Sequence, residues 1–110
     1  TNPLFLTGSE DLADAGAASL SKSVSYFTTA SNPESATLAA GTEGQVKILA
    51  MAGDSGDMVI TVTNAGWKSS GTGTITFTDI GQTVTLMYIN SKWFVIAVGP
   101  GASNTFPTLA

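Results

Sequence analysis

The stretch TVTLMYINSKWFVIAVGPG, residues 83–101, predicts a β-hairpin and thereby points to the fold class. Its first half alternates apolar and polar residues, as a half-buried strand does. Asn90 and Ser91 supply a two-residue turn, because Asn tolerates a positive φ. The returning half is different, since every residue from Trp93 to Val98 is apolar. A strand of this kind has two apolar faces, and one core can cover only one of them.

Each face of the returning strand therefore needs its own cover. We predict that one face packs in the domain core, formed by Val84, Leu86, Tyr88, Trp93 and Val95. The other face carries Phe94, Ile96 and Val98, and two covers are possible: an opposing sheet that buries a central strand, or neighbouring copies in an oligomer. The low charge of the chain favours neighbouring copies, so we predict that these three residues form an oligomer interface.

The rest of the chain shows the same period of two, with turns rich in Gly, Pro, Asn and Ser. TITFT at 74–78 is its clearest example, with Ile75 and Phe77 on the inward side. Seven strands without a convincing helix predict an all-β domain, a small antiparallel β-sandwich or a jelly roll or barrel. We expect an extended N-terminal arm at 1–16, the β-domain at 17–100 and a C-terminal tail at 101–110.

Composition excludes several kinds of chemistry. The 110 residues include no His, Cys or Arg, and four lysines against eight acids give a formal net charge of -4. Thiol, disulfide and imidazole chemistry are thus absent, and the lysines are too few and too scattered for a nucleic-acid interface. Only 11% of the residues are charged, about half of the usual share, which favours neutral surfaces packed on other proteins. We expect no enzyme, no catalytic residue and no cofactor.

Three local features could carry function. Asp54 and Asp57 flank the DSGD turn, but two carboxylates fall short of a calcium site, so we expect a plain turn and no metal. Trp67, in a loop rich in Gly and Ser at 64–73, either stacks on a sugar or caps the core, and we favour the cap. Lys47 stands between Val46 and Ile48, and we expect a surface lysine there, not a buried base.

The N-terminal region suggests an attachment segment. Pro3, Leu4, Phe5 and Leu6 form a short apolar cluster on an otherwise irregular arm, which we expect to dock on a partner. No run of 18 apolar residues and no signal-peptide pattern is present, so we expect no membrane partner and synthesis in the cytoplasm. The first residue, Thr1, fits either removal of an initiator Met or proteolytic processing.

Three runs carry a family resemblance: ATLAAGTEGQVKILAM, GDMVITVTNAGW and GTITFTDIGQTVTLMYINSKWFVIAVG, within residues 36–99. They resemble small β-rich virion structural proteins of marine tailed phages, cyanophages among them, and SEDLADAGAASL in the arm is similar too. The resemblance implies a homotrimeric protein of the capsid exterior or the tail. Its arm would bind the major capsid protein, and no catalytic motif comes with it.

Two functions follow from these observations. The first is a capsid decoration or cement protein that binds the outside of the phage shell and stabilises it. The alternative is a tail-fibre or host-attachment module that binds a surface glycan through Trp67.

Overall fold

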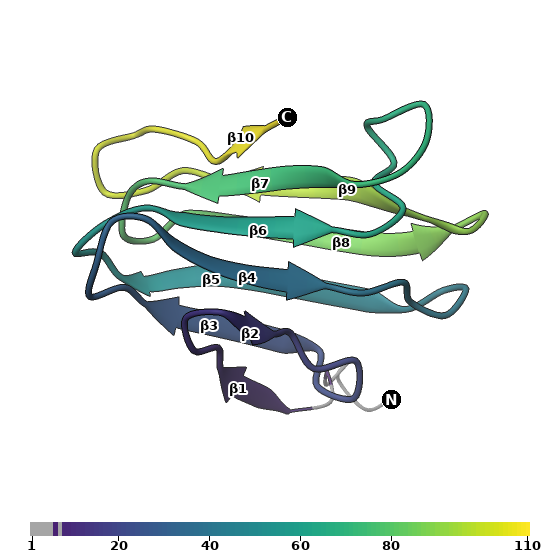
Figure 1. Ribbon diagram of the computed structural model, residues 1–110, viewed down its shortest axis with the longest axis horizontal. Helices are drawn as coiled ribbons and strands as arrows, with labels where there is room; N and C mark the ends of the chain where they lie inside the picture. The colour runs from purple at the N-terminus through teal and green to yellow at the C-terminus, as the bar shows by residue number, and fades with distance from the viewer. Residues whose placement is uncertain (1–5, 7) are drawn as a thin grey trace, which may run out of the picture.

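The computed structural model describes Leu6 and residues 8–110, which form two five-stranded β-sheets packed face to face (Figure 1). No helix occurs in these residues. Sheet A has the order β1-β3-β5-β8-β9, and sheet B has the order β10-β7-β6-β4-β2. The strands of sheet A are β1 (Ser9–Asp11), β3 (Val24–Thr28), β5 (Val46–Gly53), β8 (Thr83–Ile89) and β9 (Lys92–Gly99). The strands of sheet B are β2 (Gly16–Ala17), β4 (Glu34–Leu38), β6 (Met58–Val62), β7 (Gly73–Phe77) and β10 (Thr108–Leu109).

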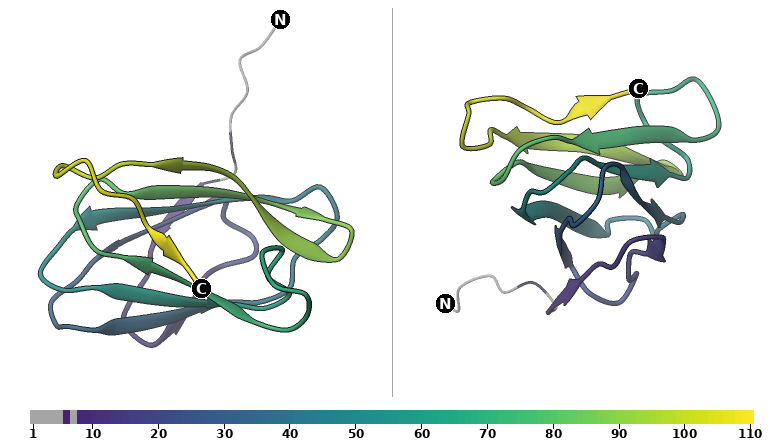
Figure 2. Two further views of the ribbon diagram at one scale, coloured as in Figure 1. Left: turned by 90° about the horizontal axis from the view of Figure 1, so that it is seen from above. Right: turned by 60° about the vertical axis from the view of Figure 1, so that its left-hand side comes forward.

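The first six strands alternate between the two sheets, so the chain winds as a flattened coil (Figure 2). Each complete turn returns to the same sheet one position further along and in the same direction. The neighbours β1 and β3, β3 and β5, β2 and β4, and β4 and β6 are therefore parallel. From β6 onward the neighbours are antiparallel. Both sheets are mixed, and the expectation of purely antiparallel pairing was wrong.

The all-β, sandwich-like class is confirmed. The seven expected strands correspond to β3–β9, and three short strands add to them. Two of these, β1 and β2, begin within the segment that we expected to be an extended arm, and β10 lies in the expected tail. Each has only two or three residues, too few to show a period in the sequence.

The core lies between the sheets and follows the predicted alternation. Ile75 and Phe77 are fully buried, and Phe77 meets Phe27 of the opposite sheet edge to face, with ring centroids 4.9 Å apart. Tyr88 and Trp93 form a second such pair at 5.0 Å. Pairs of this geometry add about 0.5–1.5 kcal/mol to simple burial. The five core residues predicted in the last hairpin are all at the core, with Val95 partly buried at its margin.

The hairpin turn is as predicted. Asn90 and Ser91 both have positive φ, 51° and 64°. Positive φ at both central residues matches the right-handed twist of the flanking strands, which favours this turn in two-residue hairpins. The turn sets the pairing of Ile89 with Lys92 and of Tyr88 with Trp93.

Candidate functional site

The outer face of sheet A is apolar where a solvent-facing sheet is normally polar. Cross-strand pairing sets its side chains in three rows that run from β3 or β5 to β9. The rows are Val46, Met87 and Phe94; Val24, Ile48, Thr85 and Ala97; and Tyr26, Ala50, Thr83 and Gly99. None of these residues is charged, and each is at least partly exposed. Two charged residues lie at the margins of the same face: Asp11 of β1 pairs with Tyr26, and Lys92 of β9 pairs with Ile89. We call this surface the sheet A face.

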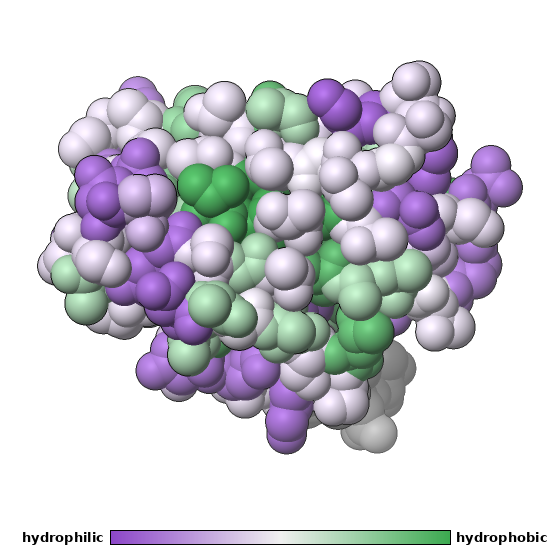
Figure 3. Space-filling model, viewed as in Figure 1, coloured by the Kyte–Doolittle hydropathy of each residue, from purple (hydrophilic) through white to green (hydrophobic). Residues whose placement is uncertain are grey.

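The opposite side of the same sandwich gives a direct comparison. Its rows are Ser35, Val59, Thr76 and Thr108, and Ala17, Thr37, Thr61 and Thr74. Hydroxyl groups dominate, as expected for a sheet face in water. Figure 3 views this side, where pale residues are interspersed with separate green patches and purple gathers around the rim. Because the two sides belong to one small protein, the apolar character of the sheet A face is local and not an effect of composition.

Strand β9 does not keep strict alternation. Leu86 pairs with Val95, whereas Thr85 pairs with Ala97, so Ile96 is an extra residue in a β-bulge. Beyond the bulge the side chains change sides: Phe94 is on the sheet A face, while Val98 lies opposite the buried Val84. The prediction that Phe94, Ile96 and Val98 share one face was therefore wrong, because it assumed an unbroken period of two.

Strands β9 and β10 leave one edge of the sandwich open. Figure 2 shows the chain after β9 crossing this edge from sheet A to sheet B, where β10 pairs with β7. Val98 of β9 and Leu109 of β10 pair with the buried residues Val84 and Ile75, so both point to the inner side of their sheets. They are nevertheless 42% and 37% exposed, and Ile96 at the bulge is 57% exposed. We call Ile96, Val98 and Leu109 the open edge.

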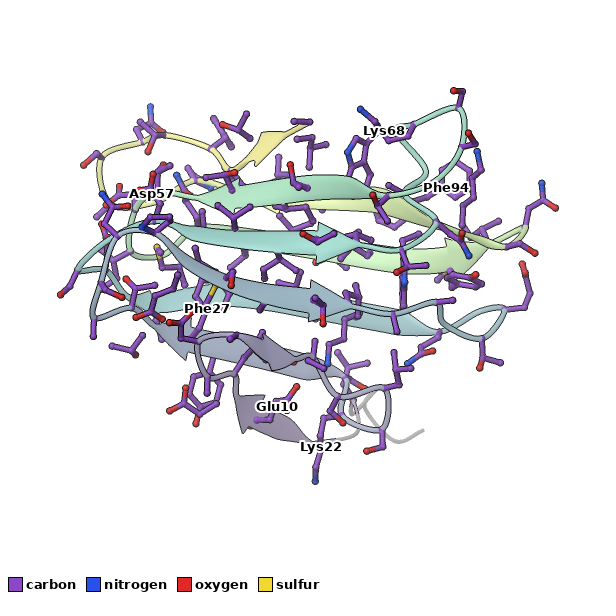
Figure 4. All side chains as sticks on the ribbon, in the orientation of Figure 1. Glu10, Lys22, Phe27, Asp57, Lys68 and Phe94 are labelled. Carbon is purple, nitrogen blue, oxygen red and sulfur yellow. The ribbon has the colours of Figure 1, made fainter. Side chains whose placement is uncertain are left out.

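The possibility that an opposing sheet buries β9 as a central strand was wrong. Strand β9 ends sheet A, and only its first residues have a partner on the far side. There Trp93 donates its backbone N–H to the Asn64 carbonyl at 2.8 Å and accepts from Gly66 N–H at 2.7 Å. Phe94 lies on the sheet A face beside this loop (Figure 4). Neighbouring copies remain a prediction as the cover for the rest of β9.

A buried charge ties the first turn of the coil to the body. Lys47 is completely buried, and the expectation of a surface lysine was wrong. Its Nζ donates to the Ser19 and Lys22 carbonyls at 2.6 and 2.8 Å and lies 3.8 Å from Glu10 Oε2. Glu10 in β1 also accepts hydrogen bonds from Ser25 Oγ and, at 2.6 Å, from Ser19 N–H.

The pKa values of this pair reflect the competition between burial and bonding. Burial alone raises the pKa of Glu10, but the hydrogen bonds from Ser25 and Ser19 and the Lys47 charge outweigh it, so the pKa lies below its ordinary value. Burial lowers the pKa of Lys47 by more than the Glu10 charge raises it. The Lys47 side chain is fully buried and its Nζ bonds two backbone carbonyls, so the arrangement holds β1 and the loop after β2 on the body of the domain.

A shallow cleft of about 510 Å³ lies near the start of the described chain. It is lined by Leu6, Leu20, Ser21, Lys22, Ser23, Thr42, Glu43, Gly44, Gln45 and Val46. Of the predicted capsid-contact arm, Leu6 lies at this cleft and is exposed. Pro3, Leu4 and Phe5 lie outside the described residues, so the contact role of the arm stays a prediction.

Trp67 is anchored to the domain. Its indole packs against the core cluster, and Nε1 donates to the Ala110 carbonyl at 3.1 Å. Gly73 lies directly under the ring, where a Cβ would come within 2.7 Å of Nε1. These contacts are those expected of a cap at the end of the core. A glycan-binding role for Trp67 stays a prediction.

The acidic turn has internal partners. Asp54 accepts a hydrogen bond from Gly56 N–H at 3.1 Å, and Asp57 N–H donates to Asn32 Oδ1 at 3.1 Å. Among residues 8–110 and Leu6, no three Asp or Glu side chains gather as metal ligands would. In that part of the chain, no helix is long and apolar enough to cross a membrane.

Sequence reasoning missed the glutamate of the buried pair and the tail residue of the open edge. Glu10 lies 37 positions before Lys47, and no local pattern links them. Leu109 follows an irregular tail with no strand signal. Comparisons with protein-family models, with curated proteins and with solved structures give no significant match to this chain.

Proposed function

We propose that this chain is a non-enzymatic virion structural protein that decorates the outside of a phage capsid as a homotrimer and stabilises the shell. The observation that carries the proposal is the sheet A face, an uncharged apolar surface spanning four strands of a domain whose other side is covered by hydroxyl groups. The sequence resemblance to small phage structural proteins supports a phage capsid as the place where the copies assemble. The major capsid protein is the proposed partner of the arm, Pro3 to Leu6.

The energetics suit a protein that acts in many copies. Complete burial of a large apolar side chain contributes about 1.5–3 kcal/mol. The residues of the sheet A face are already partly buried, so each contributes less, on the order of 1 kcal/mol. Single contacts of this size are weak, but linking several copies raises their combined affinity for a lattice without any new contact. A decoration protein works in this way.

Purified virions test the proposal directly. We expect shells that lack this protein to lose integrity at a lower temperature than complete shells at matched salt, and added purified protein to restore the difference. Shells that withstand the same temperature with and without the protein would contradict a stabilising role.

Copy number separates the capsid from the tail. Densitometry of virion proteins is expected to show this chain in proportion to the major capsid protein. Copies in proportion to the tail proteins would instead support the tail-fibre or host-attachment role. Glycan binding that is lost in Trp67→Ala would then be the next measurement.

A further inference from the structure

We propose that copies of this chain join face to edge: the open edge of one copy packs on the sheet A face of the next. The inference rests on the proposed assembly function and deepens it, because it says which surfaces meet and what symmetry results. It starts from the β-bulge at Ile96, which distributes the apolar residues of β9 over two different surfaces.

The two surfaces adjoin along β9 but lie on different sides of it. Phe94 and Ala97 complete the sheet A face, whereas Val98 points to the inner side of the sheet and is exposed only because the sandwich is open there. A two-fold contact uses the same self-complementary patch on both copies, whereas two different surfaces joined head to tail give a ring when the rotation between copies closes and an open filament when it does not. A copy with two adjoining apolar surfaces is suited to a ring, and three is the smallest number of copies that closes one.

The charge distribution argues for a second copy as the occupant. Two chains of net charge -4 repel each other least where neither carries charge. Residues 93–110, which include the whole open edge, contain no Asp, Glu, Lys or Arg. The opposite edge of the sandwich is different, with exposed Asp11 in β1 and exposed Asp14 just before β2. Beyond Lys92, the first residue of β9, the β9 and β10 edge has none of the charges that normally protect an edge strand from pairing.

The sheet A face has room for the edge of a neighbouring copy. Its rows span four strands, about 19 Å, and the six residues of β9 from Phe94 to Gly99 extend about 20 Å, so the face covers roughly 400 Å². A contact of this size is below the roughly 600 Å² per partner of a standard interface. One joint alone is therefore weak, and a closed ring, in which every copy makes two joints, stabilises the assembly.

Paired variants test the inference by the mass of the purified protein in solution. Tyr26→Asp places a charge on the sheet A face, and Ile96→Asp places one on the open edge; both positions are exposed, so the fold is expected to survive. We expect the wild type at three times the chain mass of 11.2 kDa and each variant alone at the single-chain mass. Thr61→Asp, at an equivalent outward position of sheet B, is the control and is expected to keep the wild-type mass.

Mixing the two variants gives the decisive result. A Tyr26→Asp copy still has a native edge, and an Ile96→Asp copy still has a native face, so an equimolar mixture is expected to form pairs with one native joint. A wild type of one or two chains, variants that keep the wild-type mass, or a mixture that stays at the single-chain mass would each overturn face-to-edge joining. Phe94→Asp with Leu109→Asp repeats the design if circular dichroism shows that a first-choice variant is unfolded.

The outcome is separable from the proposed function. Wild-type protein that is a single chain in solution but protects shells from heat would overturn this inference and leave the decoration role standing. Rings that form as described but neither occur in virions nor protect shells would overturn the decoration role and leave face-to-edge joining standing.

Discussion

The Lys47 side chain is enclosed by protein, yet its ammonium group has three oxygen neighbours. Two are backbone carbonyls, of Ser19 and Lys22, and the third is the Glu10 carboxylate. A buried charge is tolerated only when it is paired and hydrogen-bonded. All three neighbours belong to the first turn of the coil, before or at the start of β3. One side chain of β5 therefore supplies the polar attachment for β1 and for the loop that follows β2.

The Glu10 carboxylate predicts a pH dependence of stability. Because its pKa is lowered in the folded protein from an ordinary value of 4.5, ionised Glu10 stabilises the fold above that value. The contribution is lost as the pH falls below 4.5 and through the lowered pKa. In Glu10→Gln the amide keeps the hydrogen bonds from Ser25 and Ser19 but does not titrate. We expect the free energy of unfolding of the wild type to exceed that of the variant at pH 7.

Urea unfolding between pH 7 and pH 3 measures this difference. The gap between the two proteins is expected to narrow with acid and to close once Glu10 is protonated. Two stability curves that run parallel over the whole range would contradict a linked proton at Glu10.

The strand face of Lys47 could be predicted from the sequence, but its pairing with Glu10 could not. In VKILAM at 46–51, strand alternation places Lys47 on the same face as Leu49 and Met51, both of which are buried. The prediction nevertheless placed Lys47 at the surface, because charge was given more weight than the strand face. Two backbone carbonyls and the carboxylate of Glu10 compensate the burial of the Lys47 ammonium group. Strand periodicity predicts neither kind of contact, because all three groups are distant from Lys47 in the sequence.

At the scale of single elements, β9 shows where a local pattern fails. The run from Trp93 to Val98 predicted a strand with two apolar faces, and both faces are indeed apolar. No residue type in the run marks a bulge, because Ile96 is as good a strand former as its neighbours. The bulge follows from the pairing with β8, which is a property of two strands. The side on which Val98 lies was thus beyond prediction from one strand.

Trp67 and β10 are coupled elements, and the coupling predicts a local effect of mutation. Ala110 accepts from Trp67 Nε1 at 3.1 Å and exchanges two backbone hydrogen bonds with Thr74. Trp67→Phe keeps an aromatic ring over Gly73 but removes the donor. One hydrogen bond contributes about 1 kcal/mol, so we expect hydrogen exchange of the Ala110 amide to become roughly fivefold faster.

The control for this measurement lies in the other tryptophan. Trp93 is fully buried and donates to the Ala39 carbonyl at 2.9 Å. Trp93→Phe is expected to lower the stability of the whole domain, and so to speed exchange in β4 to β9 as well. Exchange at Ala110 that is unchanged in Trp67→Phe would show that β10 is held by its pairing with β7 alone.

At the scale of the molecule, the coiled path of the chain determines which strands pair and in which direction, and the strand patterns alone do not predict this. Alternating strands present the same inward and outward faces whether their neighbours are parallel or antiparallel. At 31–34 and at the DSGD turn, 54–57, the chain crosses between the sheets, so each flanking strand pairs with a strand from another turn of the coil. The class of fold was accessible from periodicity, whereas the pairing depends on contacts between segments remote in sequence.

The same order predicts that Lys47 changes from stabilising to destabilising when the first turn of the coil is removed. In the full chain, Lys47→Leu leaves the Ser19 and Lys22 carbonyls without their donor and Glu10 without its ion-pair partner, and we expect a loss of about 2–4 kcal/mol. In a chain that begins at Ser23, the oxygens of Glu10, Ser19 and Lys22 are gone and the ammonium group lacks them all. There, Lys47→Leu is expected to increase stability, because an apolar side chain in the same place carries no unpaired charge.

Circular dichroism at low temperature and in increasing urea measures the fraction of folded protein. It shows whether Lys47→Leu raises or lowers stability in the full chain and in the chain that begins at Ser23, even where the shortened chain is only partly folded. Lys92 supplies the matched control, since its Nζ donates to the Lys68 and Ser69 carbonyls at 3.1 Å at the surface, and both of these partners lie outside the first turn. Lys92→Leu is expected to have the same small effect in both chains. If Lys47→Leu destabilises both backgrounds equally, the buried lysine is held by something other than the first turn.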